Sequence, residues 1–155
     1  MPAANLQKAL AKAYRGVEAH RIFESLKYAS LDTVLSTLES DELKSAVSYV
    51  AETKEIPLLQ IIKNGHVEWG FSFNENQLWI QGQIDLWGEV DGQVWLVDYK
   101  TGSSAFANSA FEQLKAYAWA LFRMKFITQN QKIHLAVVYP FERKIKVERS
   151  YSIPL

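Results

Sequence analysis

Three charged side chains near the ends of two predicted strands could do chemistry together. Asp85 lies in a segment that alternates apolar and polar residues, and Asp98 and Lys100 come directly after a second, strongly apolar segment. Between the two segments stands Asp91-Gly92, a pair typical of a two-residue hairpin turn. If these two residues form the turn, counting outward along both strands places Asp85 opposite Asp98.

Opposed carboxylates of this kind favour a metal site. Directly opposed side chains have Cβ atoms about 4.5–5.5 Å apart, so Asp85 and Asp98 would repel each other unless a cation lay between them. Alternation along the strand places Lys100 on the face of Asp98, and the same register places it opposite Gln83. Carboxylate oxygens suit Mg²⁺ or Mn²⁺, and a lysine beside them could orient water or offset phosphate charge. The pattern predicts metal-assisted hydrolysis.

Two other interpretations use the same residues. In the first, a surface hairpin carries only an ion pair between Asp98 and Lys100. The preceding run 94–97 argues for a central strand, where charges are rare unless they are paired or metal-bound. In the second, Asp85 and Asp98 act without metal as an acid/base pair, as in glycoside hydrolysis. Lys100 argues against this, because it would keep both acids ionised, whereas a general acid needs a raised pKa.

Helical patterns fill the first part of the chain. Apolar residues at helical spacing predict one long helix over residues 4–27. Residues 31–52 predict two short helices with a break near Ser40, which stands where an N-cap would. Pro57 permits a further short turn through Ile62. Residues 1–64 are therefore expected to be mainly helical.

Residues 65–155 predict a sheet with one crossover helix. Strict alternation from residue 66 predicts a first strand. Ser109 and Glu112 form a capping-box pattern at the start of a helix that runs to about Lys125. The other predicted strands are 78–86, 94–99, 133–139 and 141–151. No linker or repeat divides the chain, so a single domain over residues 1–155 is expected.

Composition excludes several classes of function. The 155 residues contain no cysteine, which excludes disulfides, thiolate zinc sites, iron–sulfur clusters and cysteine catalysis, and favours a reducing, cytoplasmic setting. The 17 basic and 17 acidic residues cancel, so attraction to nucleic acid must come from a local patch. No segment approaches the ~20 apolar residues of a membrane span, so no membrane association is expected.

Three segments resemble the signature of RecB-type nucleases in the PD-(D/E)XK superfamily. They are Gly82-Gln83-Ile84-Asp85, then Val97-Asp98-Tyr99-Lys100-Thr101-Gly102, then Gln113-Leu114-Lys115-Ala116-Tyr117. Upstream, Gly16-Val17-Glu18-Ala19-His20 with Glu24 is similar to the helix that supplies a histidine ligand in this family. The resemblance covers roughly residues 14–125. It implies an α/β fold with a restriction-endonuclease-like core, in which a mixed sheet of antiparallel hairpins and one strand after a crossover helix is flanked by helices.

The same resemblance implies roles for individual residues. It implies that Lys100 is the catalytic lysine, and that a metal is bound by the side chains of His20, Asp85 and Asp98 and by the backbone carbonyl of Tyr99. Gln113 and Tyr117 match the motif after the catalytic strand, and their i, i+4 spacing places them on one helical face. Taken alone, His20 would be interpreted as a surface or core histidine. Gly16, one turn earlier, could let the helix approach the sheet closely.

Further residues are second-tier candidates. Glu68 shares the face of Asp85 if Glu75-Asn76 is the turn of the preceding hairpin, and Glu24 lies one turn after His20. Aromatic residues of the crossover helix could stack on bases, although core packing is the more common role, and basic residues of the last strand could contact phosphate or only face solvent. The first group is Tyr117, Trp119 and Phe122, and the second is Lys144, Lys146 and Arg149.

The resemblance implies a Mg²⁺- or Mn²⁺-dependent deoxyribonuclease that serves DNA repair and recombination, an exonuclease rather than an endonuclease, acting on single-stranded DNA or duplex ends. In the family this domain often forms the C-terminal part of a helicase–nuclease such as AddA or RecB, and sometimes stands alone. No Walker motif is present, so a helicase motor would lie on another segment or subunit. The alternative is a catalytically silent domain that binds DNA or a partner protein. Silent domains of this kind usually lack one of the acids or the lysine. This chain has all of the expected residues, namely His20, Asp85, Asp98 and Lys100.

Overall fold

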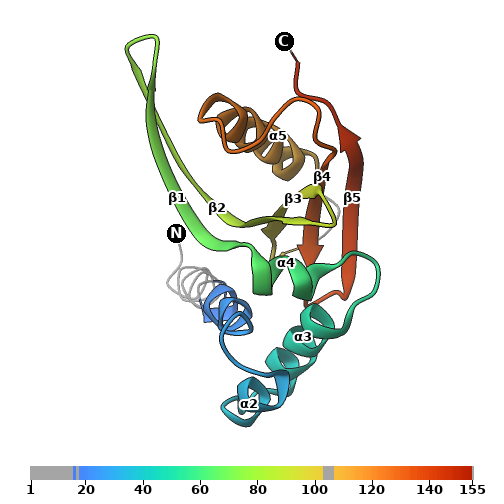
Figure 1. Cartoon of the computed structure of the whole chain (residues 1–155). Coiled ribbons are helices and arrows are strands. Elements are labelled where there is room, and N and C mark those ends of the chain that lie inside the picture. Colours follow the sequence, from blue (N-terminus) through green and yellow to red (C-terminus); the bar gives the residue numbers. More distant parts are fainter. Residues whose placement is uncertain (1–15, 17, 103–106, 155) are drawn as a thin grey trace.

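A five-stranded mixed sheet forms the centre of the protein (Figure 1). The computed structural model describes residues 16, 18–102 and 107–154. The strands lie in the order β1-β2-β3-β4-β5, with β3 and β4 parallel and the other neighbours antiparallel. Their bounds are β1 His66–Glu75, β2 Leu78–Val90, β3 Gln93–Tyr99, β4 Ile133–Tyr139 and β5 Lys144–Tyr151. The predicted mixed sheet of antiparallel hairpins with one strand after a crossover helix is confirmed.

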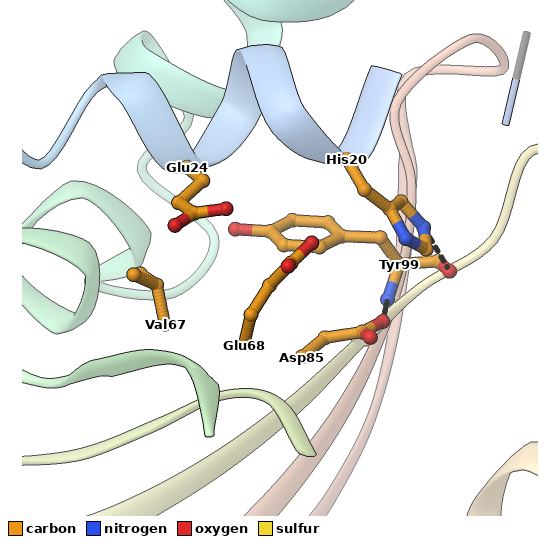
Figure 2. A pocket seen from close by; sticks show the side chains of 6 residues that line it. All are labelled: His20, Glu24, Val67, Glu68, Asp85 and Tyr99. Carbon is orange, nitrogen blue, oxygen red and sulfur yellow. Dashed lines mark hydrogen bonds between the residues drawn. The ribbon is translucent and has the colours of Figure 1, made fainter. Parts of the chain in front are cut away.

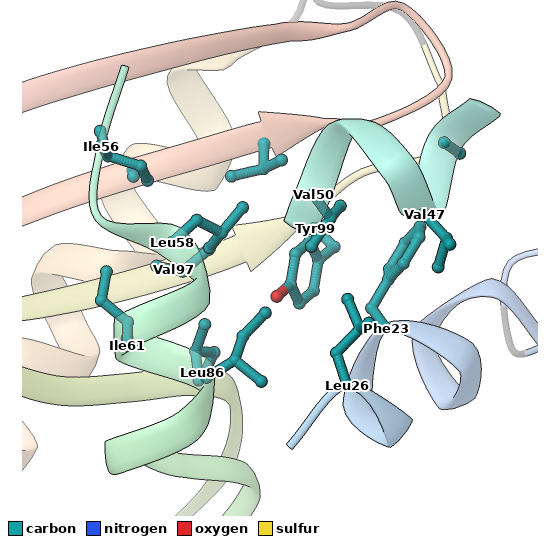
Figure 3. Close-up of a cluster of buried hydrophobic side chains, with 14 of the residues drawn as sticks. Phe23, Leu26, Val47, Val50, Ile56, Leu58, Ile61, Leu86, Val97 and Tyr99 are labelled. Atoms are coloured by element: carbon teal, nitrogen blue, oxygen red, sulfur yellow. The ribbon is translucent and has the colours of Figure 1, made fainter. Parts of the chain in front are cut away.

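Helices cover both faces of this sheet. On one face α4 Leu58–Asn64 packs against β1 and β2, and α3 Asp41–Glu52 packs on α4 and α2 Leu31–Ser36 on α3. A first helix at residues 18–25 joins them in one cluster of buried side chains. Phe23 and Leu26 meet the buried side chains of α3, α4 and the sheet there (Figure 3). The other face packs against the crossover helix α5, Ala107–Arg123. In the described part of the chain, every helix is too short or too polar to cross a lipid bilayer.

Capping residues explain where the short helices begin. The side chains of Ser30 and Ser40 accept hydrogen bonds from the backbone amides of Thr33 and Leu43, each at 3.2 Å. These bonds satisfy amides that have no partner inside the helix, so the predicted break near Ser40 is confirmed. After Pro57 the chain forms the helix α4 rather than a single turn.

Several predicted boundaries are wrong, among them the end of the strand predicted over 78–86, which continues to Val90. Ser109 lies inside α5, which already includes Ala107, because the capping-box pattern also fits two exposed residues one turn apart within a helix. The last strand begins at Lys144 rather than at residue 141, since a turn closed by the bond from Glu142 N to Tyr139 O comes first. The first helix ends at residue 25 rather than 27, and residues 4–15 of the prediction lie outside the described residues.

Two glycines let α4 end directly against β2. A Cβ atom at Gly88 would lie 2.8 Å from the Cα atom of Gly65, and one at Gly65 would lie 2.5 Å from the carbonyl oxygen of Trp87. Non-bonded atoms do not approach so closely, so both positions require glycine. The contact fixes the helical layer on the strand that carries Asp85.

Candidate active site

The register of β2 and β3 brings the two predicted acids together. Asp91 and Gly92 have φ angles of 52° and 78° and form the predicted turn. The paired residues run outward from this turn to Leu86 opposite Val97, where the ladder ends. Asp85 and Asp98 come next along their strands, and the charge of Asp85 acts on Asp98. Because the β2–β3 ladder stops before the acids, the predicted pairs Asp85–Asp98 and Lys100–Gln83 are not among its cross-strand pairs, and Gln83 pairs with Gly70 of β1.

Glu68 extends this row onto the edge strand β1. The pairs Val67–Leu86 and Trp69–Ile84 flank it, so the register places Glu68 opposite Asp85. The hairpin turn consists of Asn76 and Gln77 rather than Glu75-Asn76. This correction leaves Glu68 on the face of Asp85, because the register shifts by an even number of residues.

The row of acids lies where β1 and β2 exchange their faces. In a regular strand Ile84 and Leu86 would share a face, yet Ile84 packs in the α5 cluster and Leu86 in the cluster beneath the other helices. Val67 and Trp69 differ in the same way, and Glu68 between them has a φ angle of 45°, which is rare for a residue with a side chain. Asp85 therefore stands at an irregular point between the two layers.

Tyr99 links Asp85 to the first helix through its backbone. Its amide donates a hydrogen bond of 2.9 Å to Asp85 Oδ2, and its carbonyl oxygen lies 3.2 Å from Nε2 of His20, which donates to it when protonated there (Figure 2). The Tyr99 ring is buried beside Phe23, with 5.1 Å between ring centroids. Three of the residues assigned to the metal site thus share one pocket.

Asp98 is a buried carboxyl beside two other charged groups. Its side chain is 12% exposed, and Lys100 Nζ lies 3.1 Å from its Oδ2. Burial, and after it the charge of Asp85, raises the pKa of Asp98 from 3.8 to about 6, although Lys100 acts in the opposite direction. Lys100 therefore offsets only part of the effect that burial and the neighbouring charge have on this pKa.

The helix α5 contributes Tyr117 and Gln113. Gln113 Nε2 donates a hydrogen bond of 2.8 Å to the Tyr117 hydroxyl, which confirms that the two share a helical face. Burial raises the pKa of Tyr117, and the negative charges of Asp98 and Asp85 add to the effect, so this ring lies near the acids. A Cβ atom at Gly82 would lie 2.8 Å from the Phe71 ring and 3.1 Å from the Tyr117 ring, which explains the glycine in the first motif.

A small pocket opens between the first helix and the acids (Figure 2). Glu24 points into it from the first helix, and Glu68 approaches it from β1. Burial raises the pKa of Glu24, and the charge of Glu68 raises it further, while Arg21 acts in the opposite direction. The lining residues are His20, Glu24, Val67, Glu68, Asp85 and Tyr99. Both second-tier acids therefore lie beside Asp85.

The oxygen atoms of this site suit a divalent cation. Oδ2 of Asp98 is buried, and among the described residues no donor meets it with hydrogen-bond geometry, although Lys100 is its ion-pair partner. Carboxylate oxygens and a backbone carbonyl are ligands that Mg²⁺ and Mn²⁺ accept. Among the described residues, however, no group of three or more His, Asp and Glu side chains is already arranged to hold a metal ion. The donor set fits the cation, and the ligand role of His20 stays a prediction.

Residues outside the acid site that the sequence proposed for DNA contacts or for close helix packing include Arg149, Trp119, Phe122 and Gly16. Arg149 packs over the Trp95 ring, with 5.4 Å from Cζ to the ring centroid, and donates a hydrogen bond to the carbonyl of Glu55. Its side chain therefore has contacts within the protein. Trp119 and Phe122 are half-buried in the α5 cluster. A Cβ atom at Gly16 would lie 3.5 Å from Thr101 Oγ1, an ordinary contact, so this position does not require glycine.

Sequence reasoning missed two features of the site. The amide of Tyr99 as the donor to Asp85 has no sequence signal, because every residue except proline carries that group. The exchange of faces at Glu68 could not be found by assuming strict alternation. An apolar residue at each of positions 67, 69, 84 and 86 conceals it.

Comparison with protein families gives a match over nearly the whole chain. The family model described as the PD-(D/E)XK nuclease superfamily matches residues 2–151. No curated protein matches the chain.

Proposed function

The chain belongs to the PD-(D/E)XK nuclease superfamily, and we propose that it is a Mg²⁺- or Mn²⁺-dependent deoxyribonuclease whose catalytic residues are Asp85, Asp98 and Lys100. The observation that carries this proposal is the buried Asp98 carboxyl, which has Asp85 beside it and Lys100 Nζ 3.1 Å away. Two carboxylates that can bind a divalent cation, with a lysine beside them, support metal-assisted hydrolysis of a phosphodiester.

The residues that would hold the cation are Asp85, Asp98 and the Tyr99 carbonyl, with His20 as a further ligand. When bound, the cation polarises the scissile phosphate and lowers the pKa of a water ligand. To bind the cation through Nε2, His20 would have to give up its hydrogen bond to the Tyr99 carbonyl oxygen. Glu24 and Glu68 line the same pocket and would hold water molecules around the site.

Lys100 acts on the phosphate in this proposal. Its ammonium group lies at the buried Asp98 carboxylate, yet its side chain is 44% exposed, so it can also reach a substrate. There it positions the attacking water or stabilises the negative charge that develops on phosphate oxygens. Tyr117 and Gln113 stand beside the acids and would contact the DNA strand.

The sequence motifs also support a proposal for how the enzyme cleaves DNA and for its role in the cell. Their resemblance to RecB-type nucleases supports an exonuclease that acts on single-stranded DNA or duplex ends in repair and recombination. We propose that the domain works with a helicase segment or subunit, or alone. The competing function is a silent domain that binds DNA or a partner protein. The complete set of two acids and a lysine supports catalysis instead.

Digestion of DNA tests this proposal. End-labelled linear and circular single-stranded DNA would be incubated with Mn²⁺ and either the wild-type chain, Asp98→Asn or Asp32→Asn. Asp32 lies in the first turn of α2 and serves as the matched acidic control. We expect the wild type and Asp32→Asn to degrade the linear DNA from its ends and to leave circles intact, and Asp98→Asn to be inactive. No hydrolysis by the wild type, or full activity of Asp98→Asn, would overturn the proposed function.

A further inference from the structure

The hairpin of β1 and β2 carries an exposed strip that leads to the candidate active site. The hairpin projects beyond the other strands (Figure 1). On one face it has three successive cross-strand pairs, all of whose members are exposed. We call these six residues the hairpin strip: Gly70 and Gln83, Ser72 and Gln81, and Asn74 and Trp79.

The opposite face of the hairpin is occupied by α5. Phe71 meets the Tyr117 ring edge-on at 5.8 Å, and Phe73 lies 6.0 Å from the Trp119 ring. Alternation therefore turns the hairpin strip away from α5, toward the side where the first helix lies. Beyond Gly70 and Gln83, the next residues toward this end of the strip on the same strands include Glu68 and Asp85, which line the pocket.

The chemistry of the strip suits a polynucleotide. It contains amide and hydroxyl groups and no carboxylate, although acids crowd the pocket at its end. Phosphates can therefore approach along it without repulsion, and the amides can donate to them. A Cβ atom at Gly70 would meet nothing closer than 4.0 Å, so the strip is open at its inner end.

Trp79 stands at the outer end of the strip with 74% of its surface exposed. Large aromatic side chains are usually buried, and an exposed one in a nucleic-acid path offers a stacking surface for a base. Asp85 follows six positions after Trp79, which is about 20 Å along an extended strand. The bases of a duplex are already stacked on each other, so only an unpaired base could lie on this ring.

We propose that the hairpin strip binds the single-stranded DNA leading into the active site and that Trp79 stacks on one of its bases. This inference rests on the proposed function, because it takes a nucleic acid as the substrate. It assigns single-stranded DNA as the preferred class and makes the hairpin the element that selects it.

Binding measurements without metal test the inference separately from hydrolysis. The dissociation constant of a fluorescently labelled single strand of about 20 nucleotides would be measured in EDTA for the wild type, Trp79→Ala, Trp79→Phe and Tyr28→Ala. Tyr28 is 77% exposed and is the matched aromatic control. We expect Trp79→Ala to bind about 5- to 150-fold more weakly, Trp79→Phe to bind nearly as well as the wild type, and Tyr28→Ala to be unchanged.

The intrinsic fluorescence of tryptophan gives a second readout. DNA should quench the emission of the wild type, and this quenching should largely disappear in Trp79→Phe although that variant still binds. Equal binding by Trp79→Ala and the wild type, an equal loss in Tyr28→Ala, or undetectable binding of DNA by the wild type would overturn the inference. A wild type that binds in this way but hydrolyses no DNA with Mn²⁺ would overturn the proposed function alone.

Discussion

At the scale of single residues, the two acids of the site are stabilised by a hydrogen-bond donor and by a positively charged side chain. Asp85 and Asp98 are adjacent carboxylates, and the Tyr99 amide satisfies the first while the Lys100 ammonium partly satisfies the second. Burial, and after it the charge of Asp85, still raises the pKa of Asp98. A bound cation would stabilise the ionised pair, so metal binding and protonation compete for the same oxygens.

The first prediction concerns the stability of the metal-free protein. Because the pKa of Asp98 is raised to about 6 from 3.8, the folded state binds this proton more tightly than the unfolded state does. The contribution of Asp98 to stability is full below about pH 4 and is lost as the pH rises through about 6. Asp98→Asn should therefore equal the wild type near pH 4 and exceed it by up to roughly 3 kcal/mol near pH 7.

Urea unfolding in EDTA at several pH values measures this difference. Asp32→Asn, an exposed acid at a helix start, provides the control and should not show the same trend. A stability difference between Asp98→Asn and the wild type that stays constant from about pH 4 to 7 would contradict the assignment.

The second prediction separates two roles of His20. Its Nε2 bonds to the Tyr99 carbonyl, which a purely structural histidine could also do. If His20 is a ligand, His20→Ala should weaken Mn²⁺ binding by about 10- to 100-fold while the protein stays folded. Isothermal titration calorimetry with Mn²⁺ and thermal unfolding of both proteins give the two readouts. Unchanged Mn²⁺ affinity in a folded His20→Ala variant would assign His20 to structure alone.

At the scale of elements, the features that could be predicted from the sequence are those set by local chemistry. Asp91-Gly92 prefers the positive φ angles of a tight turn, so these two residues are enough to predict the register of β2 and β3 as far as Leu86 and Val97, the neighbours of the two acids. The cap at Ser40 depends on the same kind of local hydrogen bond. The mixed sheet required the family resemblance, since strand order depends on contacts between distant segments.

Other features depend on tertiary contacts and could not be predicted. The exchange of faces at Glu68 arises because the inner end of β1 packs under the helical layer and its outer part packs on α5. The start of α5 before Ser109 has no distinct pattern, since neighbouring residues are also good helix formers. The ligand set around His20 came from resemblance to a family, and it stays a prediction.

The third prediction tests the contact between α4 and β2. An alanine at position 88 would bring its Cβ within 2.8 Å of Gly65 Cα, so the helix must shift away from the strand. We expect Gly88→Ala to lower the free energy of unfolding by about 1–3 kcal/mol. Gly70→Ala lies on the same hairpin with open space around it and should change stability little. Equal unfolding midpoints in urea for Gly88→Ala and the wild type would contradict the close approach.

At the scale of the whole molecule, the site joins the helical part of the chain to the sheet. His20 and Glu24 belong to the first helix, Asp85 and Asp98 to the sheet, and Tyr117 to the crossover helix. One hydrophobic cluster contains side chains of both the helical part and the sheet. The site can therefore form only when all three layers are assembled.

The fourth prediction concerns this shared core. Because the helices between residues 18 and 64 and the sheet bury their apolar residues against each other, the two should unfold in one transition. Unfolding in urea would be monitored by far-UV circular dichroism, which reports helices, and by tryptophan fluorescence, since all five tryptophans lie in the sheet and α5. Two separate midpoints would show that the two parts are independent domains.

The fifth and most direct measurement compares Lys100→Ala with the wild type for both Mn²⁺ affinity and hydrolysis of single-stranded DNA, with Lys54→Ala as an exposed lysine control. Lys100 serves the reaction rather than the metal in the proposed mechanism, so Lys100→Ala should bind Mn²⁺ at least as well as the wild type and lose about 100-fold or more in turnover. Lys54→Ala should match the wild type in both. Turnover of Lys100→Ala equal to that of the wild type would contradict the assignment of this site as a nuclease centre.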